Sequence, residues 1–151
     1  DVNYNALSKK GYTNLVFDVD NTLVERINPL PDIAIKDLLL DLKKKGFKIV
    51  LVSNNSNSKR LIAIADYLQT EIVMLSFKPL PFVYRKLQKD FGFLPRNTVF
   101  FGDQLFTDIL GAKLHGYYTV YIYPIGVEVN WVRKNYINLE KVLIRRMLRQ
   151  N

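Results

Sequence analysis

Short apolar runs, rich in branched and aromatic residues, alternate along the chain with segments that have apolar residues at helical spacing. The short runs predict β-strands near residues 14–19, 48–53, 71–75, 98–101 and 119–123. Strands that alternate with helices are typical of a parallel sheet whose faces are covered by those helices. The pattern therefore predicts an α/β fold, without an internal repeat or a domain boundary.

Helices are predicted between these strands, over residues 31–45, around 61–68, around 83–91 and over 107–115. Pro31 suits the first turn of a helix, because its backbone angle is already helical and its missing N–H is not needed there. The glycines at 46, 92 and 116 each suit the end of a helix.

Residues 130–151 predict a terminal amphipathic helix. One apolar stripe would pack on the sheet and consists of Val132, Tyr136, Leu139, Leu143 and Met147. A different face carries Lys134, Lys141, Arg145 and Arg149. Two interpretations stay open: a core helix with a solvated basic side, or a helix that contacts an anionic membrane surface or a partner.

Composition and charge add to this picture. At 151 residues, with 48% hydrophobic and 24% charged residues, the chain fits one globular domain over residues 1–151. The formal net charge of +8 is uneven, because residues 131–151 hold six bases and one acid. This basic tail favours anionic partners. The first residue is Asp1 rather than Met, so we expect natural residues before it.

The chain has no cysteine, which excludes disulfides and thiolate metal sites and favours a reducing compartment. No run in the sequence approaches the ~20 apolar residues that span a bilayer. We therefore expect a cytoplasmic protein, whose basic tail could contact the inner face of the membrane.

Polar residues that could do chemistry come directly after the predicted strands. Asp18 and Asp20 follow the first strand, Ser53-Asn54-Asn55 the second and Asp103 the fourth. In open parallel sheets, ligands bind at the carboxyl edge where the strand order reverses. Burying two acids beside a core strand is costly unless something pairs with them, usually a metal. The pattern therefore predicts a cation site and a nucleophile on a rigid support.

Each motif alone has a simpler interpretation. An Asp-x-Asp pair is often a solvated turn, Ser53-Asn54-Asn55 could cap the following helix, and Lys78 could be a surface lysine. The combination and its order favour the catalytic interpretation.

Four segments carry a resemblance to a known family: Asp18-Val19-Asp20-Asn21-Thr22, Ser53-Asn54-Asn55, Lys78-Pro79 and Gly102-Asp103-Gln104-Leu105-Phe106-Thr107-Asp108. In this order they resemble the haloacid dehalogenase-like superfamily of aspartate-nucleophile phosphotransferases. The pattern is also similar to the subgroup IIIA phosphatases of the YqeG type, which are related to phosphatidylglycerophosphate phosphatases.

The resemblance implies the catalytic roles. Asp18 would be the nucleophile that forms an aspartyl-phosphate, and Asp20 would protonate the leaving oxygen and then activate water. Ser53 and the backbone amide of Asn54 would bind phosphoryl oxygens near a helix N-terminus. Lys78 would offset the charge between nucleophile and phosphate.

The resemblance also implies a Mg²⁺ cofactor, an ion that prefers hard oxygen ligands. The expected ligands are the Asp18 carboxylate, the Asp20 backbone carbonyl and the Asp103 carboxylate, with Asp108 supporting the metal or its waters.

The predicted architecture is a Rossmann-like three-layer α/β/α domain whose five-stranded parallel sheet has the order 5-4-1-2-3. Residues 21–30 are too few for a large cap domain between the first motif and its helix. An open site would admit phosphate groups displayed on large bodies or surfaces, and a homo-oligomer could supply a lid.

We thus expect a Mg²⁺-dependent phosphomonoester hydrolase, with phosphatidylglycerophosphate or another anionic phosphate ester as its substrate. One alternative is a phosphatase for soluble nucleotide or sugar phosphates. Another is a non-catalytic module that binds nucleic acid or an acidic partner through the basic tail, against which the acid at Asp20 argues.

Overall fold

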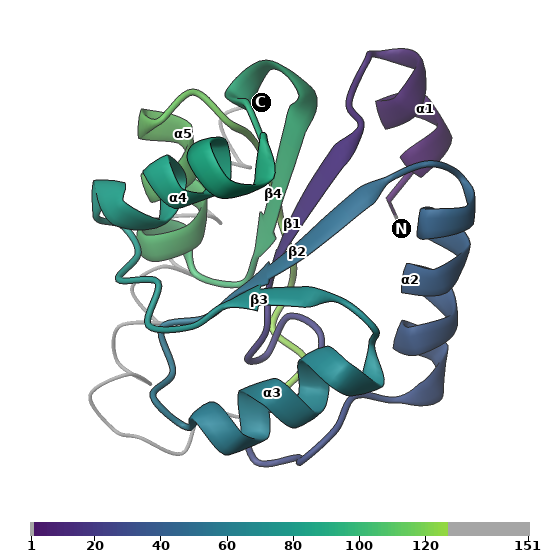
Figure 1. Cartoon of the computed structure of the whole chain (residues 1–151), viewed down its shortest axis with the longest axis vertical. Coiled ribbons are helices and arrows are strands. Elements are labelled where there is room, and N and C mark those ends of the chain that lie inside the picture. Colours follow the sequence, from purple (N-terminus) through teal and green to yellow (C-terminus); the bar gives the residue numbers. More distant parts are fainter. Residues whose placement is uncertain (1, 127–151) are drawn as a thin grey trace, which may run out of the picture.

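A computed structural model describes residues 2–126 of the chain (Figure 1). The predicted helix over residues 130–151 lies outside the described residues. The strands are β1 (Asn14–Asp18), β2 (Lys48–Val52), β3 (Glu71–Val73), β4 (Thr98–Gly102) and β5 (Tyr118–Tyr121). The α-helices are α1 (Tyr4–Lys9), α2 (Ile33–Lys44), α3 (Ser58–Tyr67), α4 (Pro81–Phe91) and α5 (Gly111–Leu114).

The five strands form one parallel sheet in the order β3-β2-β1-β4-β5. This is the predicted order read from the opposite edge, so the Rossmann-like prediction is confirmed. After β1 the chain builds β2 and β3 on one side, and it then returns to place β4 and β5 on the other side. The carboxyl end of β1 is therefore the point where the strand order reverses.

Successive residues of each strand face opposite sides of the sheet, and two hydrophobic cores follow from this alternation. On one face, Leu15 and Phe17 of β1 pack in a core with buried residues of α1, α2 and α3. On the other face, Val16 packs in a core with buried residues of α4 and α5. Figure 1 shows these two groups of helices on opposite sides of the sheet, which completes the three layers.

Two elements differ from the prediction. Helix α1 was not predicted, because it has six residues and Leu7 is its one buried side chain, which is too little for a periodic signal. The helix predicted over 107–115 begins instead as a π-helical segment, Leu105–Leu110, and continues as α5. Within that segment the Ile109 N–H donates to the Gln104 carbonyl, five residues earlier, at 3.2 Å.

Among the described residues, no helix has both the length and the apolar character needed to cross a bilayer.

Candidate active site

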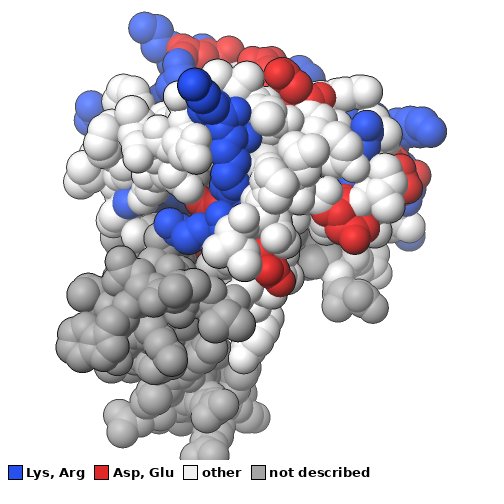
Figure 2. Space-filling model, turned by 90° about the horizontal axis from the view of Figure 1, so that it is seen from below, with Lys and Arg blue, Asp and Glu red and all other residues white. Residues whose placement is uncertain are grey.

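A pocket of about 250 Å³ opens at the carboxyl end of the sheet. It is lined by Asp18, Asp20, Arg26, Ser53, Asn54, Asn55, Ser56, Lys78, Gln104 and Thr107. In Figure 2, which views the molecule from below, Lys and Arg side chains gather in the middle of this face beside visible acidic atoms. The segments that carry the four sequence motifs thus meet in one place.

Three buried carboxylates form the centre of the site. Asp18 ends β1, Asp103 follows β4, and Asp108 lies in the π-helical segment. Each offers one carboxylate oxygen, and these oxygens lie within 4.8 Å of one another. The Thr22 hydroxyl lies 3.3 Å from Asp18 Oδ2 and 3.5 Å from Asp103 Oδ1.

Asp108 reaches this cluster because of two local features. Gly102 has no side chain, and a Cβ there would lie 2.4 Å from the Asp108 Cβ, closer than atoms can pack. The Gln104 N–H donates to Asp108 Oδ2 at 3.0 Å, across the first turn of the π-helical segment. The Gly-Asp-x₄-Asp spacing of the fourth motif is therefore a requirement of close packing as well as of chemistry.

Lys78 joins two of the three carboxylates. Its Nζ lies 2.5 Å from Asp18 Oδ1 and 2.8 Å from Asp108 Oδ1. Burial favours a lower pKa for the Lys78 ammonium, but the carboxylates of Asp108 and Asp18 outweigh it and raise the pKa above its ordinary value. Lys78 is thus a fixed positive charge in the cluster.

The side chain of Asn54 holds the Lys78 backbone. Asn54 Oδ1 accepts from the Lys78 N–H at 2.9 Å, and Asn54 Nδ2 donates to the Lys78 carbonyl at 2.9 Å. The Ser76 hydroxyl donates to the same Asn54 oxygen at 2.7 Å. The sequence pattern pointed to the backbone amide of Asn54, whereas its side chain connects the second motif to the third.

Ser53 is buried in the pocket wall, and its Oγ accepts from the Asn55 N–H at 3.1 Å. Helix α3 begins five residues later, at Ser58, and its N-cap is Asn57, which accepts from the Arg60 N–H at 3.2 Å. The alternative that Ser53-Asn54-Asn55 caps this helix is therefore wrong, and the phosphate-binding role of Ser53 stays a prediction. A loop separates Ser53 from the start of α3.

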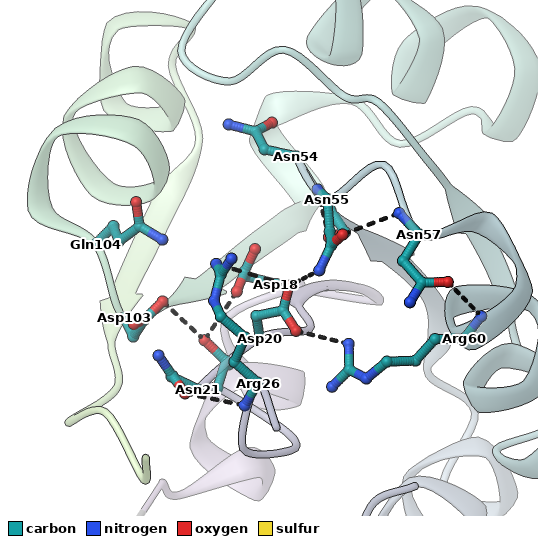
Figure 3. Close-up of polar contacts among 12 residues, drawn as sticks. Asp18, Asp20, Asn21, Arg26, Asn54, Asn55, Asn57, Arg60, Asp103 and Gln104 are labelled. Atoms are coloured by element: carbon teal, nitrogen blue, oxygen red, sulfur yellow. Dashed lines mark hydrogen bonds and ion pairs between the residues drawn. The ribbon is translucent and has the colours of Figure 1, made fainter. Parts of the chain in front are cut away.

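The Asp20 carboxylate lies outside the carboxylate cluster. Arg60 NH1 is 2.7 Å from Asp20 Oδ1, Asn55 Nδ2 donates to Asp20 Oδ2 at 2.9 Å, and Arg26 NH2 is 3.8 Å from the same oxygen. Figure 3 shows Asp20 between Arg60 and Asn55, away from Asp103. The two acids of the Asp-x-Asp motif thus have different environments.

Arg60 and Arg26 were missed by the sequence analysis. A signal existed for Arg60, because a base in the first turn of a helix meets the positive end of the helix dipole and needs a compensating partner. Arg26 gave no such signal, since it lies in a loop whose path the sequence pattern does not define.

Burial raises the pKa of the Asp18 carboxyl to about 7, and the neighbouring Asp108 adds to the rise while Lys78 opposes it. Three buried carboxylates beside one lysine leave an excess of buried negative charge, which is energetically costly without further positive charge. Their hard oxygen atoms are the donors that small divalent cations prefer. The site can therefore hold a divalent cation at Asp18, Asp103 and Asp108.

This shift makes stability depend on pH. In the unfolded chain Asp18 ionises near its ordinary pKa of 3.8, whereas the folded protein keeps the proton up to a pH of about 7. Without metal, the free energy of unfolding should therefore fall as pH rises through this range. Relative to Asp18→Asn, wild type should lose stability between pH 4 and 7 in urea unfolding with EDTA.

The exposed acid Asp66 offers a control, since it lies in the last turn of α3 and belongs to neither the pocket lining nor the carboxylate cluster. The stability difference between Asp66→Asn and wild type should not have this pH profile. Added Mg²⁺ should raise the melting temperature of wild type more at pH 8 than at pH 5, because the ion competes with the proton. Parallel curves for wild type and Asp18→Asn would contradict the assignment.

Known proteins with similar sequences bear the names of phosphatases. The "Probable phosphatase YqeG" of Bacillus subtilis is 25% identical over 95% of this chain and 83% of its own length. The "Glyceraldehyde 3-phosphate phosphatase" of Pyrococcus furiosus is 31% identical over 65% of this chain. The "Phosphatidylglycerophosphate phosphatase 1, chloroplastic/mitochondrial" of Arabidopsis thaliana is 23% identical over 99% of this chain. The chain spans 45% of the length of each of the last two.

A solved structure, of the hypothetical protein XCC2798 from Xanthomonas campestris, matches 89% of this chain and 76% of its own with a TM-score of 0.64. At 17% identity this match supports the fold alone. The model of the haloacid dehalogenase-like hydrolase family matches residues 25–116, a range that includes Lys78, Asp103 and Asp108. Since this match covers more than half of the chain, the chain belongs to the haloacid dehalogenase-like hydrolases.

Proposed function

We propose that the protein is a Mg²⁺-dependent phosphomonoester hydrolase that works through an aspartyl-phosphate on Asp18. The observation that carries the proposal is the cluster of Asp18, Asp103 and Asp108 around Lys78, with Asp20 held apart beside the same pocket. Asp18 lies in the carboxylate cluster, where a bound divalent cation would favour its ionised form as a nucleophile, whereas Asp20 lies apart with Asn55, Arg26 and Arg60, so the two acids can take different roles.

The charges of the site support a divalent cation. Four carboxylates (Asp18, Asp20, Asp103 and Asp108) face three basic side chains (Lys78, Arg26 and Arg60). If all are ionised, a bound divalent cation changes the net charge from one negative to one positive, which attracts a phosphate ester. Asp18, Asp103, the Asp20 carbonyl and Asp108 or its water would hold Mg²⁺, which would offset negative charge on the phosphoryl group.

In the first step an Asp18 oxygen attacks phosphorus and the bond from phosphorus to the ester oxygen breaks. Asp20 donates its proton to that leaving oxygen, which departs as an alcohol. Lys78, with Ser53 and the Asn54 backbone amide, would hold the phosphoryl oxygens in line for this displacement.

In the second step water attacks the phosphorus of the aspartyl-phosphate. Asp20, now a carboxylate, takes the proton of that water, and the bond between phosphorus and Asp18 breaks. Inorganic phosphate leaves, and both side chains return to their starting states. Asp20 therefore serves both half-reactions, once as an acid and once as a base.

The described residues contain no cap domain over the pocket, since the connection from β1 to α2 has 14 residues (19–32) and that from β2 to α3 has five (53–57). An open pocket suits a phosphate group carried on a large or surface-bound body, and the Arabidopsis relative bears the name of a lipid-phosphate phosphatase. We therefore propose an anionic phosphate ester, including phosphatidylglycerophosphate, as substrate. The Pyrococcus relative bears the name of a glyceraldehyde 3-phosphate phosphatase. A soluble phosphate ester is therefore the second candidate substrate.

One domain over residues 1–151, a basic C-terminal helix at a membrane surface, a cytoplasmic location and a homo-oligomer all stay predictions. The experiments below do not depend on them.

Replacing Asp18 by Asn removes the nucleophile and keeps the shape of the side chain. We expect Asp18→Asn to lower kcat on p-nitrophenyl phosphate to ~10⁻⁴ of wild type or less, because the covalent route is lost. Circular dichroism should show an unchanged fold. EDTA should abolish wild-type turnover and Mg²⁺ should restore it. Normal turnover by the variant would refute the assignment of Asp18.

Asp20→Asn removes the proton donor. Its effect should depend on the leaving group, because an alkoxide needs a proton and p-nitrophenolate does not. We expect a loss of about 10²- to 10⁴-fold in kcat on an alkyl phosphate and a clearly smaller loss in the rate of p-nitrophenol release in a single turnover. Equal losses on both substrates would exclude the acid role.

A further inference from the structure

We infer that exposed apolar side chains in the loop after β3 and in the first turn of α4 dock the protein on an anionic lipid surface. This docking patch consists of Leu75, Phe77, Leu80 and Phe82. The inference deepens the proposed function by naming the surface that would present the substrate, and its kinetic part rests on that function.

The loop that carries Lys78 turns its polar side chains inward and its apolar side chains outward. Ser76 is fully buried and its hydroxyl donates to Asn54, while Lys78 is 5% exposed in the carboxylate cluster. Leu75 and Phe77 alternate with them and are 46% and 55% exposed. The site explains why Ser76 and Lys78 face inward. It does not explain why the outward positions hold large apolar residues, since polar residues there would be hydrated.

The backbone of both outward residues is unfavourable for bulky side chains. Leu75 has a φ of 46° and Phe77 a φ of 51°, in the left-handed region that glycine and asparagine adopt more easily. Two large apolar side chains thus lie on the surface at positions whose backbone favours other residue types. Backbone outliers of this kind cluster at functional sites.

The patch continues from the loop into α4. Leu80 and Phe82 are 58% and 55% exposed. The rings of Phe77 and Phe82 contact each other edge to face, with 6.3 Å between their centroids. Phe77, Leu80 and Phe82 therefore form a connected surface rather than scattered side chains, and a connected apolar surface of this kind marks an interaction site.

The groove beside the patch is basic. It has a volume of about 540 Å³, and its lining adds three bases and one acid to the apolar residues: Arg85, Lys86, Lys89 and Asp90. Lys86 pairs with Asp90 at 2.5 Å, so the lining keeps an excess of positive charge. Apolar side chains beside basic ones match an anionic lipid surface, because the first enter the interface and the second attract headgroup phosphates.

The same charges disfavour a second copy of this chain on the patch. In a twofold-symmetric contact the same surface lies on both partners. Arg85 and Lys89 would then approach their own counterparts, and like charges that face each other across an interface are costly. A lipid surface with anionic headgroups places negative charge opposite them instead.

The patch adjoins the proposed active site. Phe77 directly precedes Lys78, and the Asn54 side chain ties the Lys78 backbone to the loop after β2 through two hydrogen bonds of 2.9 Å. Figure 1 shows the two loops side by side at the same edge of the sheet. Lys78 and Asn54 both line the pocket. A lipid surface held by the patch would therefore lie beside the pocket that would receive a phosphate headgroup.

Vesicle flotation with the full chain tests the docking without any need for turnover. It compares vesicles of phosphatidylglycerol and phosphatidylcholine with vesicles of phosphatidylcholine alone. We expect wild type to bind the anionic vesicles. The double variant Leu80→Ser, Phe82→Gln should bind them at least ~10-fold more weakly, because two apolar side chains no longer enter the interface. Arg85→Gln with Lys89→Gln should weaken binding ~10-fold, and less at high salt.

The chain offers matched controls on the opposite face of the sheet. Ile62→Gln removes an exposed apolar side chain of α3, and Lys9→Gln with Lys44→Gln removes two exposed charges of α1 and α2. These variants should bind the anionic vesicles like wild type.

Turnover is measured on two substrates. On p-nitrophenyl phosphate the two patch variants should match wild type, since none of the replaced residues lines the active-site pocket. This match also shows that they are folded. On phosphatidylglycerophosphate in the anionic vesicles, kcat/KM should fall by about the factor by which vesicle affinity falls.

The outcomes separate the two proposals. Absence of wild-type binding to anionic vesicles, or binding that the patch variants keep, would overturn the docking and leave the phosphatase intact. A wild-type dimer that Leu80→Ser with Phe82→Gln converts to monomers would also overturn it, because a second copy would then occupy the patch. Failure of wild type to hydrolyse both substrates, with vesicle binding that depends on the patch, would refute the proposed function and support the docking.

Discussion

The ion cluster of Asp18, Asp108 and Lys78 is the constraint on which the rest of this structure depends. These three side chains are almost completely buried, and each charge removed from water costs several kcal/mol before its partners compensate it. Lys78 compensates part of that cost by contacting both carboxylates. With Asp103 beside them, the cluster still has an excess of negative charge. Such a cluster could hold a divalent cation, which would compensate this excess.

The scaffold holds the cluster through close packing around it. β1 lies between β2 and β4, so Asp18 ends a strand that is paired on both sides. Gly102 leaves the space that Asp108 occupies. Gly111 likewise allows a close approach, because a Cβ there would lie 2.7 Å from the Pro79 Cβ. A larger residue would push α5 away from the loop that carries Lys78 and Pro79. The two glycines thus let Asp108 and the start of α5 pack closely against β4 and the Lys78 loop.

The pocket brings together two groups of side chains. The first is the carboxylate cluster with Lys78. The second surrounds Asp20, which is equally buried but pairs with Asn55, Arg26 and Arg60, from the loops after β1 and β2 and from the first turn of α3. In the proposed reaction the first group would carry phosphoryl transfer, and the second would surround the proton donor for the leaving group.

Much of this protein could be predicted from its residues in order. Alternation of apolar runs with helical periodicity is a local signal, and it predicted the five strands and the carboxyl edge at which Asp18, Asp20 and Asp103 lie. The strand order and the place of Lys78 in the site followed from the resemblance of the four motifs to the haloacid dehalogenase-like superfamily. The residues around Asp20 could not be predicted, because Arg26 and Arg60 reach it across loops whose paths depend on contacts between distant segments. The side-chain role of Asn54, the π-helical segment that turns Asp108 inward and the separation of Ser53 from the start of α3 were likewise set by three-dimensional packing. Sequence periodicity specifies which face of an element is buried, whereas the partner of a polar side chain is decided only when the elements have packed together.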